Sequence, residues 1–181
     1  VNGSNGQTQN RGACAELTAD IDLNNDLWTP IGPGESGSYT GTFDGKGHTI
    51  KNLNASSSET YVGLFGYIGH RAISNTPVVV QRGAVRNLTV VGKVTGTGQT
   101  GQSVYVGGIA GWVYDGLVAN CANLCIVENK GGGYTGGIAG YVECVDGYQN
   151  SAVLISDCYN VGTITGANRV GGIAGGVDFF S

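Results

Sequence analysis

Short apolar runs interrupted by glycine recur along the whole chain. They are rich in Val, Ile, Thr and Tyr, and each is bounded by Gly, Asn or Asp. Short runs of this composition between turn-forming residues are typical of β-strands. Apolar residues nowhere keep the 3.6-residue spacing of an amphipathic helix. The pattern therefore predicts an all-β chain.

The apolar runs contain an internal repeat. Four blocks align on a glycine that precedes Leu or Ile, and a second glycine follows three residues later; the first glycines are Gly63, Gly108, Gly137 and Gly172. Between these blocks a second line recurs, with matched polar and sulfur side chains at Asn87, Asn120 and Asp157, at Cys121 and Cys158, and at Asn123 and Asn160. Chemically matched residues at matched places are what stacking of one repeat on the next requires.

The fold that we expect is a right-handed parallel β-helix, or β-solenoid, with irregular corner loops. Short strands at this spacing also occur in propellers and sandwiches, but glycines inside apolar strands favour a narrow coil with tight corners. Residues 1–60 are expected to supply N-terminal strands that cap the solenoid and lead into it, and residues 61–181 its repeat coils, in one continuous domain. The period breaks at residues 74–82, 97–103 and 146–151, which we expect to be loops inserted at corners.

Composition narrows the classes of partner. The chain has 34 glycines in 181 residues, 12% charged residues and a net charge of −4. It has no basic face for nucleic acid or an anionic membrane, and no apolar run reaches the roughly 18 residues of a membrane span. Methionine is absent, so we expect Val1 not to be a natural start and the chain to be a piece of something longer.

The residues that could carry chemistry are few. Five cysteines leave at least one that is free or paired elsewhere. Stacking would place Cys121 over Cys158, either as a thiol ladder or as a disulfide. No CxxC pair is present and His48 and His70 are the only histidines, so neither a metal site nor a cofactor is expected.

One aromatic row is the candidate binding site. Tyr67, Trp112 and Tyr141 each follow the last glycine of their block, and Gly176 ends the row. With Ile109 and Val113 facing inward, Trp112 would face outward, and an exposed aromatic row is a platform for sugar rings or a partner protein. The alternative is that the row packs under a corner loop or only stabilises stacking. A shorter second row consists of Tyr105 and Tyr134, with Arg169 next.

The repeats carry a family resemblance. The VGGIAG blocks, with GLFG in the first, resemble the GLUG motif, and NCANLCIV and DCYNVGTITG resemble that family's Asn/Asp-Cys-x-Asn segments. The lead-in LTADIDLNNDLWTPIG is similar to a stretch that often precedes GLUG repeats, so the resemblance covers nearly all of residues 15–177. It implies an extracellular, bacterial cell-surface setting, in adhesin-like proteins or beside IgA-specific metallopeptidase domains. It implies no catalytic residues in the repeats, and the peptidase's HExxH motif is absent here.

We therefore expect a non-catalytic structural or adhesive module of a larger bacterial cell-surface or secreted protein, with a glycan or a host protein as its partner. One alternative is a filament subunit that associates with its own kind through open solenoid ends. A second alternative is a β-helix carbohydrate-active enzyme, for which the candidate acids are Asp44, Asp115 and Asp157. Each of these acids has a turn-like context in which it would bond its own backbone.

Overall fold

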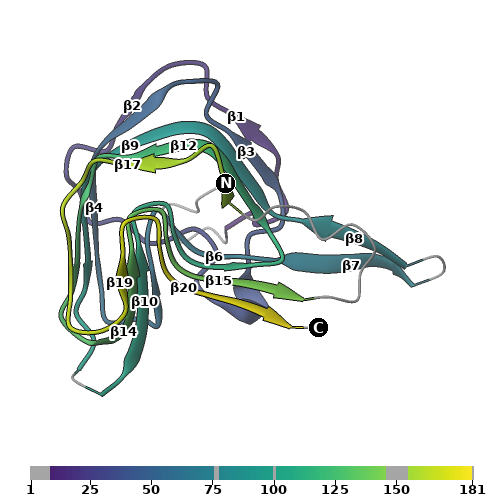
Figure 1. The fold of residues 1–181 in the computed structure, drawn as a ribbon. Helices are drawn as coiled ribbons and strands as arrows, with labels where there is room; N and C mark the ends of the chain where they lie inside the picture. The colour runs from purple at the N-terminus through teal and green to yellow at the C-terminus, as the bar shows by residue number, and fades with distance from the viewer. Residues whose placement is uncertain (1–8, 76–77, 100, 146–154, 181) are drawn as a thin grey trace.

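The computed structural model describes residues 9–75, 78–99, 101–145 and 155–180. Within these ranges the chain is all-β, as predicted, and its single helical element is the short 3-10 turn η1 (Glu35–Gly37). Its strands form three parallel sheets and one antiparallel pair (Figure 1).

The largest sheet has ten strands in the described part of the chain: β1 (Ala15–Glu16), β2 (Ile21–Asp22), β3 (Thr42–Asp44), β4 (Thr49–Ser57), β9 (Ala84–Gly96), β12 (Leu117–Asn123), β13 (Ile126–Asn129), β16 (Ile155–Ser156), β17 (Tyr159–Asn160) and β18 (Ile164–Gly166). A second sheet, the β5 sheet, contains β5 (Tyr61–Val62), β10 (Ser103–Gly107), β14 (Gly132–Gly136) and β19 (Val170–Gly171). A third, the β6 sheet, contains β6 (Phe65–Ile68), β11 (Ala110–Tyr114), β15 (Ala139–Val145) and β20 (Ala174–Phe180).

The chain visits these sheets in a fixed order. One pass runs from the ten-stranded sheet to the β5 sheet and then to the β6 sheet, for example β9, β10 and β11, and the next pass repeats it with β12, β13, β14 and β15. All strand pairs between passes are parallel, with Tyr105 opposite Tyr134 and Trp112 opposite Tyr141. Each repeat of the sequence therefore lies on the preceding one in register.

Alternation within the strands separates core from surface. In β10, Val104 and Val106 are buried in the core, and Tyr105 between them faces outward. In β9 the core positions include Val85, Leu88 and Val90, all at most 1% exposed. Removing these side chains from water stabilises the fold by roughly 1.5–3 kcal/mol for each one that is fully buried.

The repeat glycines lie one above another, as the sequence predicted. The amide of Gly108 donates to the carbonyl of Gly137 at 3.1 Å, and the amide of Ile109 donates to Ile138 at 3.0 Å. A Cβ atom on Gly137 would lie 2.2 Å from the carbonyl oxygen of Gly172. Neighbouring atoms leave no room for a side chain at Gly63, Gly108 or Gly137, whereas Gly172, in the last pass, has no atom within 4 Å of an added Cβ.

The three predicted corner loops have different outcomes. At the second of them, β9 ends at Gly96 and β10 begins at Ser103, so a connection between strands does lie there. Residues 74–82, however, belong mostly to an antiparallel pair, β7 (His70–Asn75) and β8 (Val78–Arg82), so the prediction of a loop there was wrong. These two strands pair with each other and project from the stack (Figure 1). Residues 146–151 lie outside the described residues.

Candidate functional site

The predicted aromatic row exists, and it faces outward from the β6 sheet. Tyr67, Trp112 and Tyr141 occupy matched positions in β6, β11 and β15. A second row runs beside it on the β5 sheet, where Tyr61, Tyr105 and Tyr134 occupy matched positions in β5, β10 and β14. The repeat pattern of the sequence had indicated only Tyr105 and Tyr134 of this second row.

The two rows interlock in the corner where the outer faces of the β5 and β6 sheets meet. Three pairs of neighbouring rings within the rows are stacked, with Tyr105 and Tyr134 at 5.2 Å between centroids and 8° between planes, whereas Trp112 and Tyr141 are tilted at 51°. Rings across the rows meet edge to face, with Tyr105 and Trp112 only 4.5 Å apart. Both arrangements are favourable for aromatic quadrupoles.

Interlocking covers most of the predicted row. Tyr67 is 5% exposed and Tyr141 is 7% exposed, and Trp112 is half-buried. Burial raises the pKa of Tyr67 above its ordinary value, and the nearby Tyr61 adds to the shift. Because Tyr67 and Tyr141 present little surface, contact with a partner would fall mainly on the half-buried rings; a binding role for the row stays a prediction.

The accessible part of this corner is a cleft at its N-terminal end. A cavity of about 630 Å³ is lined by Glu35, Ser36, Ser38, Tyr61, Tyr67, His70 and Tyr114. It lies where the stack is incomplete, because β5 is the edge strand of its sheet. The first pass of the chain bypasses that sheet: the Trp28 amide bonds the Asn54 carbonyl of β4, and Ile31 already bridges to Phe65 of the β6 sheet.

Carboxylates accompany the aromatic rings in the β6 sheet. Glu143 and Asp178 lie in register with Tyr114, two residues beyond the aromatic row, and the Tyr141 hydroxyl donates to Asp178. Burial raises the pKa of Glu143, and the negative charges of Asp178 and Glu35 raise it further. The sequence contained a signal for this stripe, because these residues share the outward alternation of Trp112 and Tyr141.

The three acids predicted from turn contexts do not lie together. Asp44 lies at the end of β3 in the ten-stranded sheet, and Asp157 is exposed between β16 and β17. Asp115 follows β11, at the far side of the β6 sheet. It is fully buried and accepts a hydrogen bond from Arg82 Nε at 3.0 Å, with His70 Nδ1 at 3.4 Å. Since His70 begins β7 and Arg82 ends β8, Asp115 holds both strands at their base.

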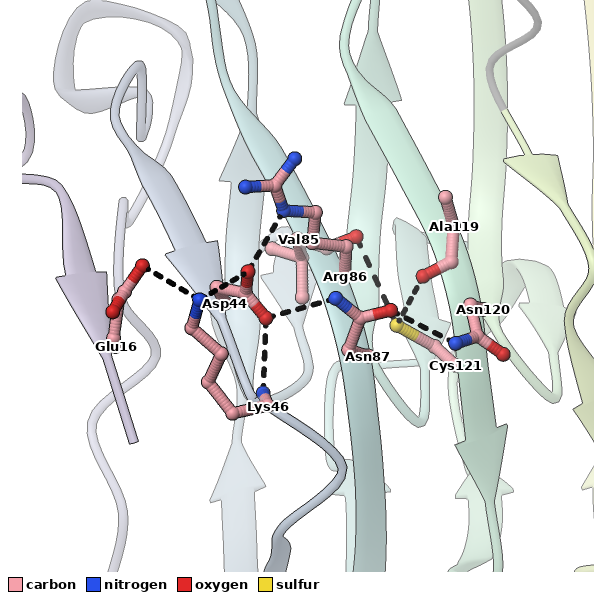
Figure 2. Close-up of polar contacts among 9 residues, drawn as sticks. All are labelled: Glu16, Asp44, Lys46, Val85, Arg86, Asn87, Ala119, Asn120 and Cys121. Atoms are coloured by element: carbon pink, nitrogen blue, oxygen red, sulfur yellow. Dashed lines mark hydrogen bonds and ion pairs between the residues drawn. The ribbon is translucent and has the colours of Figure 1, made fainter. Parts of the chain in front are cut away.

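Asp44 begins a ladder of polar side chains that crosses successive passes (Figure 2). It accepts from Asn87 Nδ2 at 2.9 Å, and Asn87 Oδ1 accepts from Asn120 Nδ2 at 2.8 Å. The hydrogen bond from Asn87, with further support from the backbone amide of Lys46 and the charges of Lys46 and Arg86, lowers the pKa of Asp44 to about 2. The conformation is left-handed at Asn87 and Asn120, with φ of 54° and 52°, which Asn tolerates better than most residues.

The predicted sulfur pair is also stacked. Cys121 and Cys158 are free thiols on adjacent passes, and each donates to the carbonyl two residues earlier, that of Ala119 at 3.2 Å and of Ser156 at 3.1 Å. Contact with the Cys121 sulfur lowers the pKa of Cys158, while contact with Cys158 and burial raise the pKa of Cys121. A thiolate in this pair therefore forms first on Cys158.

The described residues contain no group of three or more His, Cys, Asp or Glu side chains placed to hold a metal ion. They also contain no helix of the length and apolarity needed to cross a membrane.

Comparison with known proteins gives one structural relative. A crystal structure of a Bacteroides ovatus protein, provisionally named an immunoglobulin A1 protease, superimposes with a TM-score of 0.60 at 26% sequence identity. The match covers 90% of this chain and 55% of that structure, so this chain spans little more than half of its relative. Neither a family model nor a curated protein sequence matches the chain. This relative is compatible with the resemblance to GLUG repeats, and no family model confirms that resemblance.

Proposed function

We propose that this chain is a right-handed parallel β-helix that serves as a non-catalytic structural and adhesive module of a larger bacterial cell-surface or secreted protein. The observation that carries the proposal is the in-register stacking of successive passes, from the opposed Tyr105 and Tyr134 to the opposed Trp112 and Tyr141. Parallel strands joined by crossovers are right-handed in nearly all proteins. A stack of this kind is a stiff spacer whose outer surface repeats at every pass.

The structural relative supports the setting of the proposal. It is a bacterial protein, it carries a protease name, and it is almost twice as long as the matched region. The GLUG-like motifs independently imply a bacterial surface protein. A protease activity belongs to the name of that relative alone, and this chain has no HExxH motif.

The contacts of two of the three candidate acids support a non-catalytic role. Asp44 and Asp115 are 3% and 0% exposed, and each is engaged by an arginine and by a further side chain. Carboxylates held in this way fix turns and strand ends, and a general acid or base must instead reach a substrate.

The adhesive part of the proposal is tested on beads that carry the purified chain at defined density. Beads with the native chain should adhere to immobilised host glycoproteins or glycans, and adhesion should increase steeply with density because many weak contacts act together. Beads with heat-unfolded chain are the control. If native beads adhere to neither class of surface, the adhesive role is wrong and a passive spacer remains.

A further inference from the structure

The cleft at the N-terminal end of the aromatic corner belongs to a longer groove. The 630 Å³ cavity shares Tyr61 with a second cavity of about 430 Å³, which Leu27, Trp28, Pro30 and Pro33 also line. It also shares Glu35, Ser36, Ser38 and His70 with a third cavity, also of about 430 Å³. The first cavity thus has lining residues in common with each of the other two, so together they suit an elongated ligand better than a compact one.

The omitted strand of the first pass explains why the groove exists. Every later rung of the β5 sheet covers its neighbour, as Tyr105 covers one face of Tyr61 at 5.7 Å between centroids. Among the described residues, β5 has no neighbouring strand on its N-terminal side. There the segment around η1 runs beside Tyr61 with a glycine at position 34, where an added Cβ atom would be in van der Waals contact with the Tyr61 ring at 3.8 Å.

The groove combines aromatic surface with neutral and singly charged polar groups. Tyr61, Tyr114 and Trp28 supply rings, Ser36 and Ser38 supply hydroxyls, and Glu35 on η1 supplies an exposed carboxylate. Rings stack on the C–H faces of pyranoses, while carboxylates and hydroxyls exchange hydrogen bonds with sugar hydroxyls.

Charge argues for a neutral ligand. Glu35 and Glu59 line the groove together with Arg11, and the Arg11 guanidinium already donates to the Ser36 carbonyl at 2.9 Å. A polyanion would meet two carboxylates, and a strongly cationic peptide would meet an arginine beside them. A neutral polyhydroxylated chain is repelled neither by the two carboxylates nor by the arginine.

We propose that this groove binds a neutral oligosaccharide chain, with Tyr61 as the stacking platform and Glu35 as the main hydrogen-bonding group. This inference rests on the proposed adhesive function and assigns its ligand class and its place. It also places binding at Tyr61, the N-terminal end of the second aromatic row, and not at the buried Tyr67 and Tyr141.

The test starts with the folded chain on an array of neutral glycans. Linear hexasaccharides of glucose, mannose and xylose are then titrated by calorimetry and by tryptophan fluorescence. Trp28 lines the groove and Trp112 contacts Tyr61 at 5.7 Å between centroids, so a ligand there should change the emission. The wild-type chain should bind at least one of the three hexasaccharides.

Four variants locate the site. Tyr61→Ala should weaken binding at least about tenfold, which corresponds to the loss of one aromatic stacking contact, whereas Tyr61→Phe, which keeps the ring, should stay within about threefold. Glu35→Gln changes an exposed side chain and should weaken binding without lowering the melting temperature. Tyr159→Ala removes a ring that is 56% exposed in the last pass, far from the groove, and should bind as the wild type does.

The outcomes separate the groove from the wider function. Glycan binding that survives both Tyr61→Ala and Glu35→Gln overturns the groove and leaves the adhesive function intact. Adhesion to proteins without binding of any neutral glycan, or a peptide that competes for the groove, overturns the ligand class alone. If Tyr61→Ala does not fold, Glu35→Gln still decides, because binding that it leaves unchanged overturns the groove.

Discussion

Gly108 lies directly against the side chain of Asn123, so closely that a Cβ atom at position 108 would be 2.1 Å from Asn123 Oδ1. Asn123 is fully buried; its Oδ1 accepts from the amide of Cys125 at 3.1 Å, and its Nδ2 donates to Asn160 at 2.7 Å. One pass later the relationship recurs, because a Cβ atom on Gly137 would lie 2.5 Å from Asn160 Cγ. The two lines of the sequence repeat thus form one structural unit, in which the missing side chain of glycine makes room for a buried asparagine.

This relationship predicts that Gly108→Ala destabilises the fold by about 2–3 kcal/mol, since the added methyl group must displace Asn123 or backbone atoms. Gly172→Ala is the matched control, because it occupies the same position of the repeat in the last pass and has no atom within 4 Å of an added Cβ. Urea unfolding of both variants measures the difference. Equal losses for the two substitutions would show that crowding against Asn123 is not the reason for the glycine.

The ladder of polar side chains gives a second prediction, at Asn120, whose backbone conformation is left-handed. Asn120→Ala and Asn120→Gly both remove the hydrogen bond to Asn87, but only alanine is strained at a φ of 52°. We expect Asn120→Ala to cost about 1–2 kcal/mol in the free energy of unfolding, and Asn120→Gly to cost clearly less. Denaturant midpoints at constant slope give the comparison. An alanine variant as stable as the glycine variant would mean that backbone conformation does not decide this position.

The sequence was sufficient to predict that the strands are parallel and stack in register, because the evidence for stacking is the recurrence of matched residues. Gly63, Gly108, Gly137 and Gly172 align in the sequence for the same reason that they stack in space. The handedness of the coil, and whether it closes, depend on the backbone geometry of its corners. A repeat of residue types does not specify that geometry.

The candidate site was less predictable, because it depends on contacts between two sheets. The outward direction of Trp112 follows from alternation within one strand. The burial of Tyr67 and Tyr141 follows from the second row, whose first member, Tyr61, belongs to a different strand. The cavity beside Tyr61 lies where the first pass omits a strand, and no local pattern around Pro30 or Ile31 indicates that omission.

Asp44 gives a prediction for stability against pH. Its pKa in the folded chain is lowered to about 2, from an ordinary value of 3.8, so its ionised form stabilises the fold above about pH 4, and that stabilisation is lost as the pH falls towards 2. Asp44→Asn should therefore lower the melting temperature at pH 7 and have little effect at pH 2. Melting curves of both proteins between these pH values test this. Parallel curves, with a constant difference down to pH 2, would contradict the role of the ionised carboxylate.

The stacked thiols give a prediction for reactivity. Contact with the Cys121 sulfur lowers the pKa of Cys158, and the thiolate is the form that reacts with iodoacetamide. Alkylation of Cys158 in the native chain should therefore reach half of its maximal rate at a lower pH than alkylation of an ordinary thiol. Cys125, which is fully buried and whose pKa burial raises to about 12, should stay unmodified.

Cys121→Ala tests whether the neighbouring sulfur, and not the exposure of Cys158, sets its reactivity. Without the Cys121 sulfur, the pH of half-maximal alkylation at Cys158 should rise towards that of an ordinary thiol, although the smaller side chain at position 121 leaves Cys158 at least as exposed. Peptide mapping by mass spectrometry follows each cysteine, and the exposed Cys14 reports the activity of the reagent in every sample. A pH profile of Cys158 that Cys121→Ala leaves in place would show that the two sulfurs titrate independently, and that their stacking serves packing alone.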